Sequence, residues 1–336
     1  MNSDQSEKRP KVGFLGVGWI GRHRMEAALA TGAIEAAAIS DPSDAMVADA
    51  LKLAPDAAVA GGLDDMLGMG LDGIVIATPS ALHAAQSVAA LQAGVAVFCQ
   101  KPLGRSAAEV RGVVDAARRA DKLLGVDFSY RFTEGMVRIR DLVAGGALGP
   151  VHAVDLTFHN AYGPDKPWFY DPAQSGGGCM MDLGVHLIDL ALWCLDFPNV
   201  ERVDGALFAK GAPLADHATQ VEDYAVATVR LAGGAVVRIA CSWNLHAGRD
   251  AAIAAEFYGP QGGAALRNVG GSFFDFTAER FSGTVAEILA SPPDAWGGRA
   301  IADWARRLGA GERFSPEAER FIQAHEVLDR VYAGRG

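Results

Sequence analysis

Short apolar runs alternate with longer segments of helical periodicity over residues 1–128 of the chain. The apolar runs span residues 12–15, 34–39, 73–77, 95–99 and 123–128. Apolar residues three and four apart recur in segments 22–30, 44–53, 80–93 and 106–120. Strands of a parallel sheet have continuous apolar runs, because helices cover both faces of the sheet. The alternation predicts a doubly wound α/β domain over residues 1–127.

The pattern changes after residue 127. Period-two alternation marks residues 151–159, 200–208, 224–231, 235–243, 252–258 and 263–269, and an Ala-Gly-Gly turn at 232–234 predicts a hairpin. Helical segments are expected at 182–195 and 316–332. When apolar and polar residues alternate along the strands, one face of the sheet is packed and the other is open or covered by a partner. We expect a second, α+β domain over residues 128–336, with an open, mostly antiparallel sheet and an apolar patch on its open face.

A glycine-rich turn joins the first predicted strand to the first helix. Gly16, Gly18 and Gly21 form a G-x-G-x-x-G sequence around Trp19 and Ile20. In a dinucleotide-binding (Rossmann) domain these glycines make the turn, let the backbone approach a pyrophosphate, and let helix and strand pack closely. The helix N-terminus then presents N–H groups to the phosphates. A ligand is therefore expected at the carboxyl ends of the strands, in a crevice between the domains.

Asp41 ends the second predicted strand, 20 residues after Gly21. An acid at that distance accepts hydrogen bonds from the adenosine ribose hydroxyls. Its charge would repel the 2′-phosphate of NADP, and Pro42 and Ser43 supply no compensating cation. The sequence therefore favours NAD over NADP.

The composition excludes several classes of binding partner. The 40 acidic and 30 basic side chains give a formal net charge of −10, which argues against nucleic acid and anionic membranes. The polar N-terminus lacks the apolar core of a signal peptide, and no apolar stretch approaches the ~20 residues that span a bilayer, so a cytoplasmic protein is expected. No Cys/His spacing indicates a metal site. The cysteines are expected to be buried, unpaired thiols: Cys99, Cys179, Cys194 and Cys241.

Two further clusters carry candidate chemistry. Gln100-Lys101-Pro102-Leu103 stands at the carboxyl end of the fourth predicted strand of the first domain. The second cluster begins with three glycines at 176–178 and continues to Asp182 and His186. These two residues are four apart, so they share one face of a helix. The triple glycine is expected to let another chain or a ligand come very close.

With these clusters the chain resembles the glucose–fructose oxidoreductase / inositol dehydrogenase / rhizopine-catabolism (Gfo/Idh/MocA) family. The matching segments are VGFLGVGWIGRHR, IATPSALHAAQSVAALQAGVAVFCQKPLGRS, VDFSYRF and SGGGCMMDLGVHLIDLALW, in family order and over essentially the whole chain. The resemblance implies that Lys101, Asp182 and His186 are catalytic. It also implies an open sheet used in a homodimer or homotetramer. The implied cofactor contacts come from the glycine turn and later loops: Gly16, Gly18, Trp19, Ile20, Gly21, Asp41, Thr78, Pro79, His83 and Lys101.

The sequence departs from the family at Gln100, where an acidic residue usually precedes the Lys-Pro pair. This removes a negative charge beside Lys101, and it bears on how that lysine is oriented and how easily it releases a proton.

The expected activity is oxidation or reduction of a secondary hydroxyl of a sugar or polyol. This reaction needs a base for the hydroxyl proton while the hydride passes to the nicotinamide. His186 is the predicted base, because histidine titrates near neutral pH. Asp182 would orient the substrate or stabilise the imidazolium, and Lys101 would stabilise negative charge on the same oxygen.

Substrate contacts are expected from the loop after the strand at 151–159 and from the domain junction. An aromatic residue such as Trp168 can stack on the apolar face of a sugar. A solvated loop with one packed tryptophan is an equal alternative, and Arg131 could instead form an interdomain ion pair. The candidates are Arg131, Asn160, Tyr162 and Trp168, with Asp182 and His186.

Two other activities fit the same pattern. An NAD-dependent glycosidase would oxidise its substrate transiently and release no reduced cofactor. A catalytically silent dinucleotide sensor would regulate a partner, but it would not need Lys101, Asp182 and His186 together. A methyltransferase shares the glycine turn and the strand-end acid, but it would need neither later cluster.

Overall fold

The computed structural model describes residues 9–334, which form two compact units. The first unit holds the chain up to Gly104, Glu109–Asp127 and Gly298–Glu319. The second holds Arg105–Ala108, Phe128–Gly297 and the chain from Arg320 onward.

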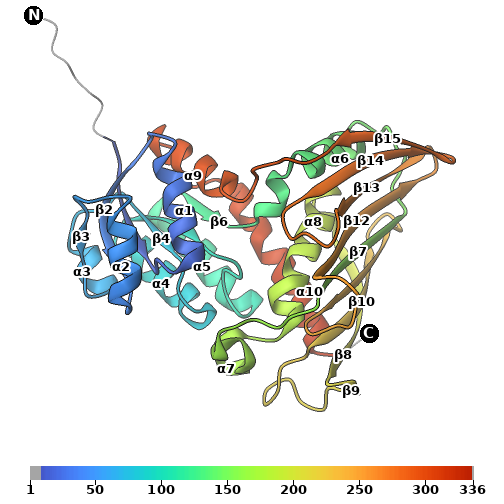
Figure 1. The fold of residues 1–336 in the computed structure, drawn as a ribbon, viewed down its shortest axis with the longest axis horizontal. Coiled ribbons are helices and arrows are strands. Elements are labelled where there is room, and N and C mark those ends of the chain that lie inside the picture. The colour runs from blue at the N-terminus through green and yellow to red at the C-terminus, as the bar shows by residue number, and fades with distance from the viewer. Residues whose placement is uncertain (1–8, 335–336) are drawn as a thin grey trace, which may run out of the picture. The chain divides into compact units, whose positions relative to one another are not determined.

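The first unit is built on a six-stranded parallel sheet in the order β3-β2-β1-β4-β5-β6 (Figure 1). This arrangement confirms the doubly wound α/β fold. The sequence pattern does not predict β3 and α3, because segments of two and five residues are too short to show a period. The strands are β1 (Lys11–Leu15), β2 (Glu35–Ser40), β3 (Ala58–Val59), β4 (Gly73–Ile76), β5 (Ala96–Cys99) and β6 (Leu124–Val126). The helices between them are α1 (Trp19–Leu29), α2 (Asp44–Leu51), α3 (Leu63–Leu67), α4 (Ser80–Gln92) and α5 (Ala107–Ala120).

A sixth helix, α9 (Arg299–Gly309), returns to the first unit late in the chain. Its Trp304 lies over the sheet, where Cβ atoms at Gly73 and Gly125 would each come within 2.8 Å of the indole. The indole also contacts Phe98 of β5, with ring centroids 5.9 Å apart. The division of the chain into 1–127 and 128–336 therefore differs from the structure at this helix. The two glycines of β4 and β6 make room for the tryptophan.

The second unit is built on a nine-stranded sheet in the order β15-β14-β13-β12-β7-β11-β10-β8-β9. All its strand pairs are antiparallel except β7 with β11. The strands are β7 (Ala153–Asn160), β8 (Val200–Ala209), β9 (Ala212–Pro213), β10 (Tyr224–Leu231), β11 (Val236–Ser242), β12 (Ala251–Gly259), β13 (Gly262–Asn268), β14 (Phe276–Ser282) and β15 (Val285–Ala290). Helices α6 (Glu134–Ala144), α8 (Val185–Cys194) and α10 (Arg320–Tyr332) lie against one face of the sheet (Figure 1). A short helix, α7 (Pro172–Ser175), precedes α8.

The opposite face of this sheet has three kinds of residue, arranged in rows across the strands. The central row is small: Ala206, Val226, Ala240, Thr157 and Ala254. A charged row with Arg238, Asp155 and Glu256 lies on one side of it, and Arg238 pairs with Asp155. Arg267, which stands opposite Ala254 at the end of the central row, pairs with Glu256. On the other side, His159 stacks on Tyr224 with centroids 5.8 Å apart. The open face is therefore not the large apolar patch that alternation alone predicts, because ion pairs interrupt it.

One helical stretch among the described residues, Pro172–Cys194, is long and apolar enough to cross a membrane by length and composition. The sequence predicts no such stretch, because glycines and Asp182 divide it into shorter apolar runs. Its most apolar window is 89% buried within the structure, as is usual for a core helix, so the stretch is weak evidence for a span.

Candidate active site

The predicted cofactor residues follow strands whose carboxyl ends meet at one edge of the first sheet. The chain runs from β1 outward to β2 and β3, then returns to β4, β5 and β6 on the other side of β1. The point between β1 and β4 is thus the topological switch point, where open α/β sheets bind ligands. The glycine turn follows β1, Thr78 and Pro79 follow β4, and Lys101 follows β5.

The glycine turn has the backbone geometry that a bound pyrophosphate requires. Gly16 has a φ of +85°, and a Cβ there would lie 2.5 Å from the Ala77 carbonyl oxygen. A Cβ at Gly21 would overlap the Gly16 carbonyl. The space beside Gly18 is open, and no side chain caps the N-terminus of α1. Uncapped N–H groups beside open space fit a dinucleotide phosphate.

Trp19 and Ile20 begin α1, next to this turn. The Trp19 side chain is 65% exposed and stacks on His23, with ring centroids 6.1 Å apart. Large exposed aromatic surface beside an anion-binding turn is suited to cover part of a bound dinucleotide. A contact between these two residues and the cofactor stays a prediction.

Asp41 ties the end of β2 to the glycine turn. Its Oδ2 accepts a hydrogen bond of 2.8 Å from the Val17 N–H, and its Oδ1 accepts one of 2.9 Å from the Ser43 N–H. A carboxylate has about four lone-pair sites, so ribose hydroxyls can still bind to it. The geometry is compatible with the predicted ribose contact and adds a second role, holding the turn in place.

His83 lies behind the loops that carry Thr78 and Lys101. It is 2% exposed, and its two ring nitrogens each lie 2.7 Å from a backbone oxygen, one of Thr78 and one of Pro102. Burial lowers the pKa of His83. Both nitrogens face the protein's own backbone, so His83 supports these two loops. The cofactor contact of His83 that the resemblance implies stays a prediction.

Asp182 lies in a π-helical turn, Met180–Gly184, that leads directly into α8. The Val185 N–H bonds back to the Met180 carbonyl, one residue further than in an α-helix. Single π turns inside helices are frequent at functional sites. Periodicity predicts a continuous α-helix here, so this turn is a difference from the expectation. Within this turn, Asp182 Oδ2 accepts a hydrogen bond of 3.2 Å from Trp243 Nε1.

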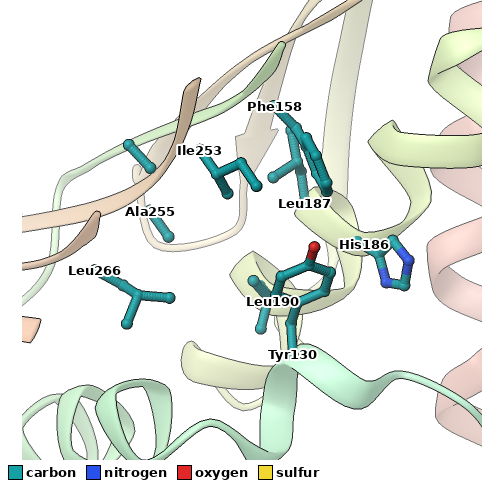
Figure 2. Close-up of a pocket in the computed structure, with 9 residues that line it drawn as sticks. Tyr130, Phe158, His186, Leu187, Leu190, Ile253, Ala255 and Leu266 are labelled. Atoms are coloured by element: carbon teal, nitrogen blue, oxygen red, sulfur yellow. The ribbon is translucent and has the colours of Figure 1, made fainter. Parts of the chain in front are cut away.

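His186 follows in the first turn of α8 and is 7% exposed. Its imidazole meets the edge of Tyr130 with centroids 4.9 Å apart, and that of Phe128 at 6.4 Å. Figure 2 shows Tyr130 among apolar side chains of the sheet and α8, with the imidazole at the margin of this group. The cavity beside Tyr130 holds about 10 Å³ and is lined by apolar side chains together with Tyr130 and His186, so it is a packing void and not a substrate site.

The triple glycine before Asp182 makes room for the protein's own chain. Glu222 is fully buried and accepts hydrogen bonds from the N–H groups of Gly178 and Met180 and from the Tyr332 hydroxyl. A Cβ at Gly178 would overlap the Glu222 backbone. Close approach is thus confirmed, but Glu222 and Tyr332 make it. They fix the backbone that leads to Asp182.

Arg131 is committed to an ion pair within the second unit. Its Nε donates to Asp189 Oδ2 at 2.7 Å, and a second guanidinium nitrogen bonds Oδ1. Its guanidinium also lies over the rings of Phe128, Trp193 and Phe197. Of the two roles considered for Arg131, this geometry favours the ion pair, although the partner belongs to the same unit.

The other substrate candidates lie around the end of β7. Asn160 has a buried Oδ1 with no hydrogen-bond partner among the described residues, so it can accept a substrate hydroxyl. The exposed Tyr162 donates its hydroxyl to Asp250 at 2.6 Å. Trp168 stacks on Phe169 with centroids 3.8 Å apart, and Phe169 meets the edge of Trp243. The aromatic contacts therefore lead from Trp168 to the tryptophan bonded to Asp182.

Sequence reasoning misses Trp243, Glu222 and Tyr332. Each acts on the Asp182 segment from a distant part of the chain, and no local motif marks any of them. An acid before a predicted strand or a tryptophan at the end of a strand is common in any sequence. Only the tertiary structure therefore reveals that these residues contact the Asp182 segment.

A switch-point glycine turn with a strand-end acid defines a dinucleotide-binding unit. NAD-dependent oxidoreductases are built on a unit of this class. The comparisons agree. Residues 10–128 match the model of the oxidoreductase family with an NAD-binding Rossmann fold, and residues 136–265 match the GFO/IDH/MocA C-terminal domain. The chain belongs to the Gfo/Idh/MocA oxidoreductase family.

Among curated relatives, D-glucoside 3-dehydrogenase of Escherichia coli is 28% identical over 72% of this chain and 68% of its own. Myo-inositol 2-dehydrogenase of Thermotoga maritima is 26% identical over 77% and 81%. A solved levoglucosan dehydrogenase with NADH and levoglucosan superposes with a TM-score of 0.82 at 21% identity, over 97% of both chains. This structural likeness shows a shared fold.

Proposed function

We propose that the protein is an NAD-dependent dehydrogenase that transfers a hydride between a secondary hydroxyl of a sugar or polyol and the nicotinamide. The observation that carries the proposal is that each unit presents one part of the needed chemistry: Lys101 follows β5 in the first unit, and Asp182 and His186 lie on a π-turn and helix in the second. The substrates in the names of the glucoside and inositol relatives support the substrate class.

Each residue has a task in this reaction. When bound, NAD accepts the hydride from the carbinol carbon. A ring nitrogen of His186 takes the hydroxyl proton, and the neighbouring phenyl and phenol rings keep bulk water from the imidazole. The Lys101 ammonium stabilises negative charge on the substrate oxygen. The Asp182 carboxylate, oriented by Trp243, stabilises the imidazolium.

The test is a panel of sugars and polyols, assayed for NADH formation in the presence of NAD. Sustained NADH production from at least one member is expected, and it should be lost in Lys101→Met. Release of sugar from a glycoside without net NADH would replace this proposal with the glycosidase. Tight NADH binding without turnover on any member would favour the sensor.

We further propose that the open face of the second sheet joins copies of the chain into a homodimer or homotetramer. A row of small side chains forms a flat strip on which a second sheet can lie. The ion pairs beside this strip involve Asp155 and Glu256, and such a polar rim surrounding an apolar centre is typical of interfaces.

A further inference from the structure

Buried side chains hold the residues on both sides of Lys101. On the C-terminal side, the Pro102 carbonyl lies 2.7 Å from the His83 ring, which also contacts the Thr78 carbonyl. On the N-terminal side, Gln100 is 7% exposed and donates from Nε2 to Asp127 Oδ2 at 2.6 Å. Lys101 therefore lies between two residues that buried side chains hold in place.

Asp127 shares its carboxylate with a cation. Arg24 Nε donates to the same Oδ2 at 2.6 Å, and the Arg24 and Asp127 side chains are 7% and 1% exposed. The buried cluster thus holds one cation, one anion and one amide. Both donors bind the same oxygen, and the buried Asp127 Oδ1 has no hydrogen-bond partner among the described residues.

This arrangement explains why residue 100 carries an amide. A glutamine donates a hydrogen bond to the Asp127 carboxylate, whereas a glutamate would place a second carboxylate against the one that Arg24 already neutralises. Two adjacent carboxylates cannot both ionise without a large cost. The negative charge therefore sits on Asp127, at the end of β6, and not on the residue next to Lys101.

Both anchors reach the cofactor loops. Arg24 belongs to α1, the helix that begins at the glycine turn, and His83 belongs to α4, which follows Thr78 and Pro79. We propose that Gln100, Asp127 and Arg24 form a positioning triad that, with His83, fixes Lys101 in register with the cofactor loops. This inference rests on the proposed function, since it assigns a position to the residue that acts in the reaction.

Four variants of the full-length protein test the triad. Gln100→Leu removes the amide donor and keeps the Arg24–Asp127 pair. Gln100→Glu adds the second carboxylate. The double variant Gln100→Glu/Asp127→Asn exchanges acid and amide while leaving Arg24 one anionic partner. Gln92→Glu, at the exposed end of α4, is the matched control for added charge.

Three readouts are measured on each variant: kcat with a sugar from the panel, the Kd for NADH, and hydrogen–deuterium exchange of the peptide covering residues 99–105. Gln100→Leu should lower kcat by about tenfold or more, because small displacements of a reacting group are costly. Exchange in that peptide should rise, while NADH affinity changes little. Gln100→Glu should show the same loss, the double variant should recover both kcat and slow exchange, and Gln92→Glu should match the wild type.

Wild-type kcat in Gln100→Leu would overturn the triad, and so would a double variant no better than Gln100→Glu. If the wild-type protein makes no NADH from any sugar, the proposed function fails by itself. The exchange measurement then still decides the inference, since unchanged exchange in Gln100→Leu contradicts it.

Discussion

At Asp41, one carboxylate serves both the ligand and the fold, because it faces the predicted ribose position and also accepts backbone hydrogen bonds from Val17 and Ser43. Asp41→Asn keeps an acceptor oxygen for one of the two backbone N–H groups and removes the charge that repels the 2′-phosphate of NADP. The ratio of the Kd values for NADPH and NADH should therefore fall, and stability should fall slightly because the other N–H group then faces the amide NH2 group. Titration of both cofactors checks this, and a wild-type preference for NADP would show that the interpretation of Asp41 is wrong.

The second residue-scale prediction concerns His186. His186→Ala removes the proposed base but leaves the glycine turn and Asp41 untouched, so turnover should fall by ~10² or more while NADH affinity holds. Steady-state kinetics together with a binding titration separate the two effects. If the His186→Ala enzyme kept wild-type turnover, His186 would not be the base.

The sequence predicts residues well where a short motif fixes both position and role. Gly16, Gly21 and Asp41 are of this kind, since a strand–turn–helix context already fixes their geometry. The roles of His83 and Arg131 depend on partners that no local pattern names. In the sequence, a histidine that contacts two backbone carbonyls cannot be told from one that binds a ligand. The same holds for an arginine that pairs with a buried aspartate.

At the scale of elements, the loop before α8 depends on glycine for space. Gly178→Ala would push a Cβ into the Glu222 backbone, so it should destabilise the protein by about 1–3 kcal/mol and displace Asp182. Gly112→Ala is the matched control, because Gly112 lies exposed in α5 with no atom near its Cβ position. That substitution should stabilise the protein by up to ~1 kcal/mol. Urea unfolding of both variants checks the contrast, which equal stabilities would contradict.

Glu222 makes the stability of the structure around the loop before α8 depend on pH. Burial raises the pKa of Glu222, although hydrogen bonds from Met180, Gly178 and Tyr332 oppose the shift. An acid whose pKa is higher in the folded state contributes most to stability below the ordinary glutamate pKa of ~4.3, and that contribution is lost as the pH rises through the folded-state pKa. Relative to Glu222→Gln, the wild type should therefore lose unfolding free energy as the pH rises above ~4.3. A difference in unfolding free energy that does not change as the pH rises would contradict the shift.

Periodicity predicts elements that are long and regular, such as β10 and α4, nearly to the residue. It fails for the π turn at Met180–Gly184, because an insertion of one residue per turn leaves the hydrophobic pattern almost unchanged. It also misses α6, whose exposed charges hide a narrow buried stripe containing Met136 and Ile139.

At the scale of the whole molecule, assembly should depend on the small-residue row of the open sheet face. Ala240→Arg places a long cation in the centre of that row and should convert the oligomer to a monomer. Ala144→Arg, at the exposed end of α6, is the control and should leave assembly intact. Light scattering at micromolar concentration distinguishes the species, and a monomeric wild type would end the proposal.

Helix α9 has a consequence for the order in which the protein is made. The ribosome completes residues up to Asp127 long before Trp304, so the first sheet emerges with its two glycine strands uncovered where the indole later lies. The nucleotide-binding unit is started first but is completed only after Phe128–Gly297 of the second unit has been synthesised. During translation that apolar surface has to be shielded by the nascent chain itself or by a chaperone, and a gene truncated before α9 would encode a permanently unfinished sheet.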